Sequence, residues 1–110
     1  MIYDTLKKIG LPCAYSHFKS KAPKSPPYIV YLGDGQNKAL ADDTIYWREN
    51  RYQVEYYFSR KDEVQEQAIE ETLLQDGYLF DKSEDVYLDD QDIFMIYYYV
   101  TKGETYGKQG

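Results

Sequence analysis

Every side chain is apolar or aromatic in the run Ile93-Phe94-Met95-Ile96-Tyr97-Tyr98-Tyr99-Val100. A strand with one face in water alternates apolar with polar residues, so this run is expected to be a strand that is covered on both faces. The second cover comes either from the same subunit or from another protein. Composition and spacing therefore predict a small α+β domain that takes part in protein interactions.

Strand patterns recur in the part of the chain that precedes this run. Tyr28 to Leu32 is β-branched and aromatic, and the turn residues Gly33-Asp34-Gly35 are expected to end that strand. Tyr52 to Phe58 alternates apolar with polar residues, although Tyr57 places an aromatic ring on the otherwise polar face. Further strands are expected at 44–47, 78–80 and 86–88, with a turn or strand edge at 48–51 and a turn at 89–92.

A short helix is expected at the beginning of the chain. Ile2, Leu6 and Ile9 recur at helical spacing, and Gly10 suits a left-handed cap, which predicts a helix over 1–9. An extended segment over 11–18 and a Lys/Ser/Pro loop over 19–27 are expected to follow.

A longer acidic helix is expected after the strand 52–58. Ser59 and Asp62 resemble a capping box, so this helix should start near Arg60 and close at Gly77. A spacing of 100° per residue predicts a buried face and an opposite face in water. The predicted buried residues are Ala68, Ile69, Thr72 and Leu73, with Val64 at the margin, and the predicted exposed ones are Glu66, Gln67, Glu70 and Glu71.

These elements predict an α+β fold. It should consist of one mostly antiparallel sheet of four to five strands, with the short N-terminal helix and the longer acidic helix packed on one face. The 110 residues fit a single domain, expected over 1–102, because two cores would each be too small. The glycine-rich segment 103–110 is expected to be a flexible tail.

Charge and composition exclude several classes of partner. The formal charge of −6 argues against a sequence-specific nucleic-acid binder, since such proteins neutralise phosphates with Lys and Arg. The only basic concentration is Lys19, Lys21 and Lys24, in the expected loop. No apolar run is long enough for a membrane span, and the N-terminal residues lack the apolar core of a secretory signal. A cytoplasmic site of synthesis is expected, as one cysteine forms no intrachain disulfide.

Catalytic and metal-binding groups are scarce. Cys13 and His17 are the only Cys and His, and in an extended segment they lie about 13 Å apart, beyond hydrogen-bond range. Two such ligands are too few for structural zinc, and the run Asp89, Asp90 and Asp92 lacks the spacing of a calcium loop. We therefore expect no enzyme activity, no catalytic residue, no cofactor and no metal.

The order of segments nevertheless resembles a known group of proteins. The features are "GLPCAYSHF", "PPYIVYLGDG", "ADDTIYWRENRYQVEYYFSRKDEVQEQAIEETL" and "DIFMIYYYVTKG", which together span nearly the whole chain. They resemble the small tail-completion proteins of long-tailed phages and prophages of Gram-positive bacteria, the tail terminator or head-to-tail joining group.

This resemblance implies a structural protein of the virion, assembled in the cytoplasm of the bacterial host. Such proteins form rings, commonly hexamers, that cap the tail tube and present a docking surface for the head connector. The implied partners are further copies of the chain, the tail tube protein and the head connector proteins. The group carries no enzymatic residues, so the site residues expected here are candidates for a subunit or partner interface: Tyr57, Leu74, Met95, Tyr97 and Tyr99.

Two other functions are alternatives to the tail protein. The first is a monomeric adaptor that binds one protein through the exposed face of the sheet. The second is a hydrolase that depends on Cys13. The mass of the assembly in solution distinguishes the first, and substitution of Cys13 or His17 tests the second.

Overall fold

A computed structural model describes residues 1–18, 25–41 and 44–105, without the side chains of 37–41, 44–47, 104 and 105. Most of the expected loop, residues 19–24, lies outside this part of the chain. The expected α+β class is confirmed, although the sheet has six strands rather than four to five. The elements are α1 (Ile2–Lys7), β1 (Cys13–Tyr15), β2 (Tyr28–Ala41), β3 (Thr44–Phe58), α2 (Glu63–Gln75), β4 (Leu79–Lys82), β5 (Val86–Leu88) and β6 (Ile93–Thr105).

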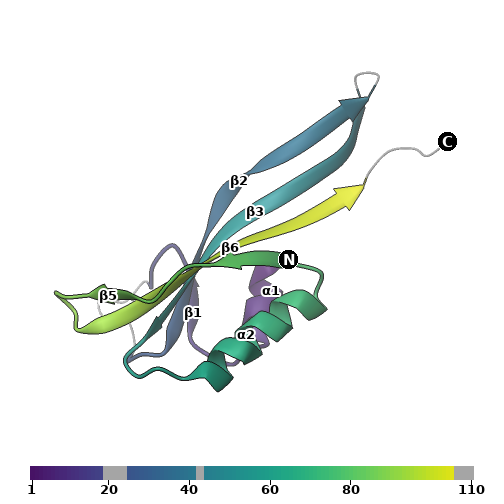
Figure 1. Cartoon of the computed structure of the whole chain (residues 1–110). Coiled ribbons are helices and arrows are strands. Elements are labelled where there is room, and N and C mark those ends of the chain that lie inside the picture. Colours follow the sequence, from purple (N-terminus) through teal and green to yellow (C-terminus); the bar gives the residue numbers. More distant parts are fainter. Residues whose placement is uncertain (19–24, 42–43, 106–110) are drawn as a thin grey trace.

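The sheet has the order β1-β2-β3-β6-β4, and β5 pairs with the same edge of β6 as β4 does. All its pairings are antiparallel except that of β1 with β2. Both helices lie on one side of this sheet (Figure 1). The sheet therefore has a helix face, which packs against α1 and α2, and an opposite face with no helix over it.

The hydrophobic core lies between the helices and the helix face. Alternate residues of β3 and β6, such as Val54 and Ile96, point into it and are fully buried. They meet Leu6 of α1 and the residues Ile69 and Leu73 of α2, all of which are also fully buried. Removal of these apolar surfaces from water is the main driving force that holds the two layers together.

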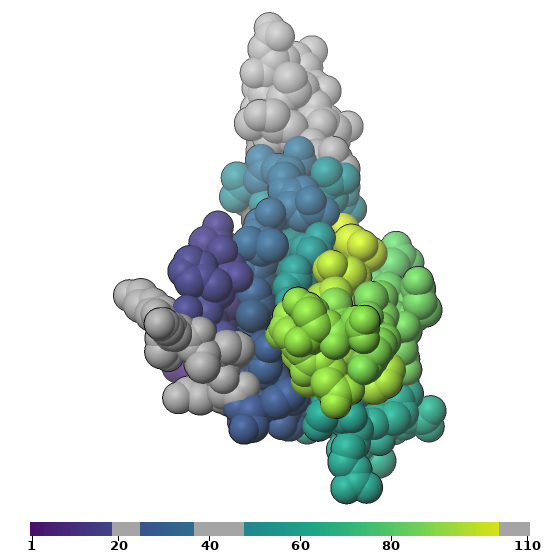
Figure 2. Space-filling view, turned by 90° about the vertical axis from the view of Figure 1, so that its left-hand side faces the viewer, coloured from purple at the N-terminus to yellow at the C-terminus, as the bar shows by residue number. Residues whose placement is uncertain are grey.

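A three-stranded arm extends beyond the part of the sheet that the helices cover. It consists of β2 from Gly33, β3 up to Arg51 and β6 from Thr101, and these strands extend beyond the helices (Figure 1). Figure 2 shows the base of the arm, in blue and teal, above the body. The principal extents are 54 × 28 × 23 Å, and the radius of gyration is 16.1 Å. A compact domain of this length has a radius of gyration of about 13 Å, so the arm makes the molecule markedly elongated.

The expected end of β2 at Gly33-Asp34-Gly35 is wrong, because the strand continues to Ala41. The register with β3 shifts between Gly33 and Gln36, where β2 contains one extra residue. Gly35 has φ +86 there, a conformation that glycine adopts without steric cost. The glycines therefore form a β-bulge. The expected break at 48–51 is likewise absent, since β3 runs unbroken from Thr44 to Phe58.

The expected start of the long helix near Arg60 is also wrong. The helix begins at Glu63, and its N-cap is Asp62, whose carboxylate accepts a hydrogen bond of 3.1 Å from the backbone N–H of Gln65. This later start accompanies a change in the buried face. Ile69 and Leu73 are buried as predicted, but Ala68 is exposed, Val64 is 76 % exposed and Glu66 is buried.

The last strand extends further than the sequence indicates. β6 runs to Thr105, so residues 103–105, which were assigned to the tail, pair with β3 instead. Residues 106–110 lie outside the described part. Gly77, with φ +87, follows the C-cap Asp76 and agrees with the predicted end of the long helix. The predicted end of the first helix is wrong, because α1 ends at Lys7 rather than at Ile9, and Gly10, with φ +90, lies beyond its C-cap Lys8.

Candidate interaction surface

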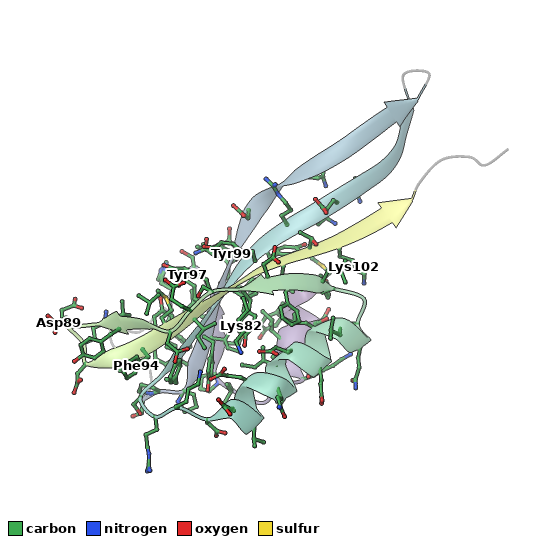
Figure 3. All side chains as sticks on the ribbon, viewed as in Figure 1. Lys82, Asp89, Phe94, Tyr97, Tyr99 and Lys102 are labelled. Carbon is green, nitrogen blue, oxygen red and sulfur yellow. The ribbon has the colours of Figure 1, made fainter. Side chains whose placement is uncertain are left out.

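The face of the sheet opposite the helices carries most of the predicted interface residues. The register of the strands brings together on this face Tyr28 and Val30 of β2, Tyr57 of β3, and Met95, Tyr97 and Tyr99 of β6. Figure 3 shows two of these, Tyr97 and Tyr99, on the side of the sheet away from α2. We call this surface the tyrosine face, and define it by Tyr28, Val30, Tyr57, Met95, Tyr97 and Tyr99.

Ring stacking orders the tyrosine face. The rings of Tyr28 and Tyr57, which are cross-strand partners, stack with centroids 4.8 Å apart. Tyr97 and Tyr99 stack along β6 at 6.0 Å. Such aromatic pairs contribute about 0.5–1.5 kcal/mol beyond the area they bury, so the rings hold a defined arrangement in the single subunit.

A carboxylate lies among these rings. Glu55 accepts a hydrogen bond of 2.6 Å from the Tyr57 hydroxyl and one of 2.8 Å from the amide of Gln53. Burial, and then the bond to Glu55, raises the pKa of Tyr57 above its usual range, so the phenol keeps its proton. Tyr97 lies directly opposite Glu55 on the neighbouring strand, and burial together with that charge raises its pKa as well.

The five predicted interface residues differ in their access to water. Tyr99 is 44 % exposed, while Tyr57 and Tyr97 are half-buried, so all three are accessible on the tyrosine face. Met95 is only 5 % exposed and, like Tyr28 and Val30, is buried within the subunit, so the accessible part of the tyrosine face is formed by Tyr57, Tyr97 and Tyr99. Leu74 is exposed but lies on α2, in the layer on the other side of the sheet, so the structure does not bring it together with the others.

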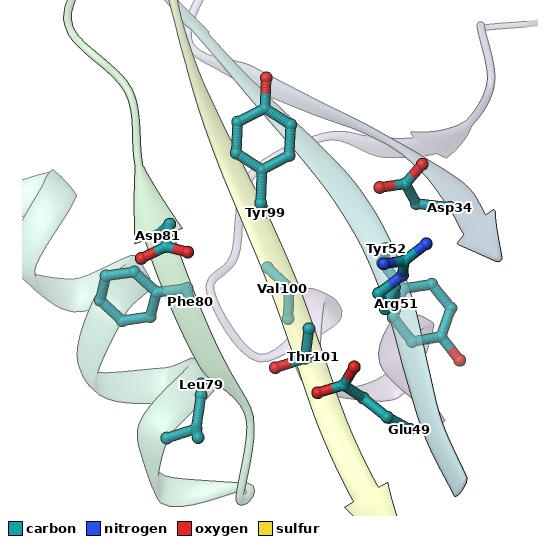
Figure 4. A pocket seen from close by; sticks show the side chains of 10 residues that line it. All are labelled: Asp34, Glu49, Arg51, Tyr52, Leu79, Phe80, Asp81, Tyr99, Val100 and Thr101. Atoms are coloured by element: carbon teal, nitrogen blue, oxygen red, sulfur yellow. The ribbon is translucent and has the colours of Figure 1, made fainter. Parts of the chain in front are cut away.

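A hollow of about 550 Å³ adjoins the tyrosine face where the arm leaves the body. Its lining comes from four strands (Figure 4), and by register the side chains that share the tyrosine side include Leu79, Asp81 and Tyr99. Leu79 is 66 % exposed beside it. The complete lining is Asp34, Glu49, Arg51, Tyr52, Leu79, Phe80, Asp81, Tyr99, Val100 and Thr101.

The sequence did not indicate the buried charge cluster between α2 and the sheet. Glu66 is 2 % exposed, and its carboxylate lies 2.8 Å from the ammonium groups of both Lys61 and Lys82. Lys82 also pairs with Glu70 at 2.8 Å, and Glu70 accepts a hydrogen bond from the Tyr98 hydroxyl. Burial alone would raise the pKa of Glu66, but the two lysines outweigh burial and hold that pKa below its ordinary value.

This cluster corrects the prediction that the carboxylates of the long helix all face water. Helical spacing indicated neither lysine, because Lys61 precedes the helix and Lys82 belongs to β4. The pairing of a buried carboxylate with two cations satisfies the requirement that a buried charge be compensated. The cluster therefore has a structural explanation as the polar contact between α2 and the sheet.

Cys13 and His17, the candidate nucleophile and base of the hydrolase alternative, lack among the described residues the surroundings that would activate them. Burial raises the pKa of the Cys13 thiol to about 11, so it is protonated at neutral pH. His17 is exposed, and its Nδ1 lies 3.2 Å from the hydroxyl oxygen of Ser16. Ser16 itself leaves the strand with φ 66.

Two further searches cover the part of the chain that the structure describes. Within residues 1–18, 25–41 and 44–105, no group of three or more His, Cys, Asp or Glu side chains is placed to hold a metal ion. None of the helices found there has the length and apolar character needed to cross a bilayer. Comparison with protein-family models finds no match to this chain, and comparison with curated proteins finds no significant match.

Proposed function

We propose that the chain is a structural protein of the phage tail-completion type, which assembles as a ring and joins the tail tube to the head connector. The observation that carries the proposal is the tyrosine face, an aromatic surface drawn from three strands with no helix over it. Aromatic residues are enriched in interfaces between proteins, where their rings bury large areas. The proposed partners are other copies of the chain, the tail tube protein and the head connector proteins.

The arm gives the proposal a second support. Beyond Tyr31 on β2 and beyond Thr101 on β6, the outer edges of the arm pair with no other strand among the described residues. Unpaired strand edges present backbone donors and acceptors to other chains. A narrow ribbon with two open edges is typical of a protein that gains part of its contacts by assembly.

A role in assembly also agrees with the absence of an evident reaction centre among the described residues. The one buried carboxylate with several partners, Glu66, is compensated by lysines, and the Cys13 thiol is protonated. We therefore propose that the protein is not an enzyme and needs no cofactor. Its acidic charge of −6 favours protein partners over sequence-specific binding to nucleic acid, and we propose no membrane partner. The proposed location is the virion, after assembly in the bacterial cytoplasm.

Electron microscopy of the purified protein mixed with tailless heads and with free tails tests this function. The expected result is attachment at the head vertex or at the end of the tail tube. Attachment to neither particle would overturn the tail-completion role. A single protein partner bound by a monomer, measured by mass in solution, would favour the adaptor instead.

Two substitutions test whether the tyrosine face is the surface used. Tyr97→Lys and Tyr99→Lys are expected to abolish attachment and self-association while circular dichroism shows an unchanged fold. The matched control is Val64→Lys, which places the same charge at an exposed position of α2, on the helix side. Equal loss of attachment in the control would show that added charge, rather than the face, is responsible.

A further inference from the structure

The hollow at the base of the arm has the chemistry of an acceptor for an extended, lysine-bearing segment. Its apolar border is formed by Leu79 and Tyr99, which are 66 % and 44 % exposed. Its charged lining is net negative, because Asp34, Glu49 and Asp81 outnumber the single cation Arg51. Neither Asp34 nor Asp81 has a hydrogen bond or ion pair within the described part of the chain. The hollow is continuous with the tyrosine face through Tyr99.

The chain contains one segment with the complementary chemistry. Residues 19–24 carry Lys19, Lys21 and Lys24 together with Pro23, and they form its only basic concentration. Proline favours extended backbone and removes an amide donor, and proline-bearing segments pack well against exposed tyrosine rings. The lysines match the two carboxylates in sign, and the proline matches the apolar border.

The described residue that precedes this segment lies away from the hollow of its own molecule. Phe18, which precedes the segment, contacts the ring of Tyr28 at the beginning of β2, on the β1 side of the sheet. The hollow begins further along that strand, at Asp34 in its middle, and extends across β3, β6 and β4. Tyr28, which Phe18 contacts, and Asp34 are six residues apart along β2, a separation of about 20 Å at 3.3 Å per residue.

We propose that residues 19–24 of one copy of the chain bind in the hollow formed by Asp34, Leu79, Asp81 and Tyr99 of the next copy. The contact joins two different surfaces, so its repetition is head-to-tail and closes a ring when the rotation between copies permits. This inference rests on the proposed function and names a contact between neighbouring subunits of the ring.

A peptide of residues 16–27, labelled with a fluorophore, tests the contact without requiring a ring. The receptor is the full chain with Lys19→Glu, Lys21→Glu and Lys24→Glu, whose hollow its own copies cannot fill by this contact. The expected result is saturable binding in fluorescence anisotropy at low salt, which weakens as salt is added. Asp34→Asn with Asp81→Asn in the receptor should reduce the affinity about fivefold, the sum of two exposed ion pairs.

Matched controls make the result specific. Glu63→Gln with Glu71→Gln removes two exposed carboxylates from α2 and should leave the affinity unchanged. A peptide with the same residues in scrambled order should bind more weakly. If the peptide does not bind, the proposal is wrong. If the scrambled peptide binds equally well, the hollow does not recognise the order of residues 19–24, and the assignment to a second copy is overturned in favour of a foreign lysine- and proline-rich partner.

The outcomes separate this contact from the proposed function. If the peptide does not bind although the protein attaches to tails or heads, the tail role stands and the contact is wrong. If the peptide binds but the protein attaches to neither particle, copies of the chain make this contact in another assembly.

Discussion

The two faces of the central sheet meet different surroundings although the same strands supply both. Along β6, Ile96, Tyr98 and Val100 are fully buried on the helix face, whereas Tyr99, between two of them, is 44 % exposed. The residues on both faces are apolar or aromatic. The comparison shows that residue type indicates a strand, whereas the position of the helices determines which of its faces they cover.

The largest difference is expected between the neighbours Ile96 and Tyr97. Ile96→Ala leaves a cavity beneath the helices and should lower the free energy of unfolding by about 3 kcal/mol. Tyr97→Ala on the tyrosine face should lower it by less than about 1 kcal/mol, because its ring is only half-buried in the single subunit. Urea unfolding of both variants measures this difference. Equal losses would mean that both faces are covered within one subunit.

The charge cluster around Glu66 contributes to stability on the helix face, and this contribution depends on pH. Glu66→Gln should lower the free energy of unfolding by about 2 kcal/mol, because it leaves two lysines without their buried carboxylate. The value is smaller than the loss for a fully buried ion pair, since Lys61 and Lys82 are partly exposed and screened by water.

The direction of the pH effect follows from the lowered pKa of Glu66. Its contribution to stability is complete above the unfolded value near 4.5 and is lost as the pH falls through the lower folded value. Unfolding measured from pH 7 down to pH 3 should therefore show a smaller acid loss in Glu66→Gln than in the unaltered protein. Parallel curves would contradict the assignment of the lowered pKa.

One tyrosine hydroxyl on each face makes a hydrogen bond whose loss should have a smaller effect on stability. Tyr98→Phe removes the hydrogen bond of 2.8 Å to Glu70 on the helix face and should cost about 1 kcal/mol. Tyr57→Phe removes the bond of 2.6 Å to Glu55 on the tyrosine face and should cost about 0.5 kcal/mol, because water replaces part of it there. Chemical denaturation of the two variants ranks the faces, and the reverse order would count against the burial described here.

The smallest effect is expected at Leu74. It is 52 % exposed on α2, away from the tyrosine face, so Leu74→Lys should change the free energy of unfolding by less than about 0.5 kcal/mol. It should also leave attachment to heads or tails intact. Loss of attachment would place a contact on the helix layer and extend the interface beyond one face.

Local sequence patterns predict most of the helices and strands but not the residues at which they begin and end. The α+β class and the positions of both helices follow from periodicity, because amphipathic spacing is a local property. The glycines at 33–35 suit a turn and a bulge equally well, since both require a residue with positive φ such as Gly35. Only the pairing with β3, which is not local, distinguishes them.

The candidate site was predictable in part for a similar reason. Tyr57, Tyr97 and Tyr99 are predicted because each places an aromatic ring where a strand with one face in water would carry a polar residue, and the register brings the three to one face. The burial of Met95 and the hollow beside Tyr99 depend on several strands at once, so no single segment indicates them. The burial of Glu66 required knowledge of Lys82, which belongs to a different element.

The bulge in β2 has a consequence for insertions and deletions in the gene. Before it, Leu32 lies opposite Gln53, on the tyrosine side; after it, Gln36 lies opposite Asn50, on the helix side, and the two amides bond at 2.6 Å. Residues of the same parity thus change sides at this point. Deletion of one codon within the bulge would make the pairing regular and leave Gln36 opposite Asn50, whereas deletion of one codon outside it, between Gln36 and Ala39, would reverse the side chains that follow as far as the next register shift.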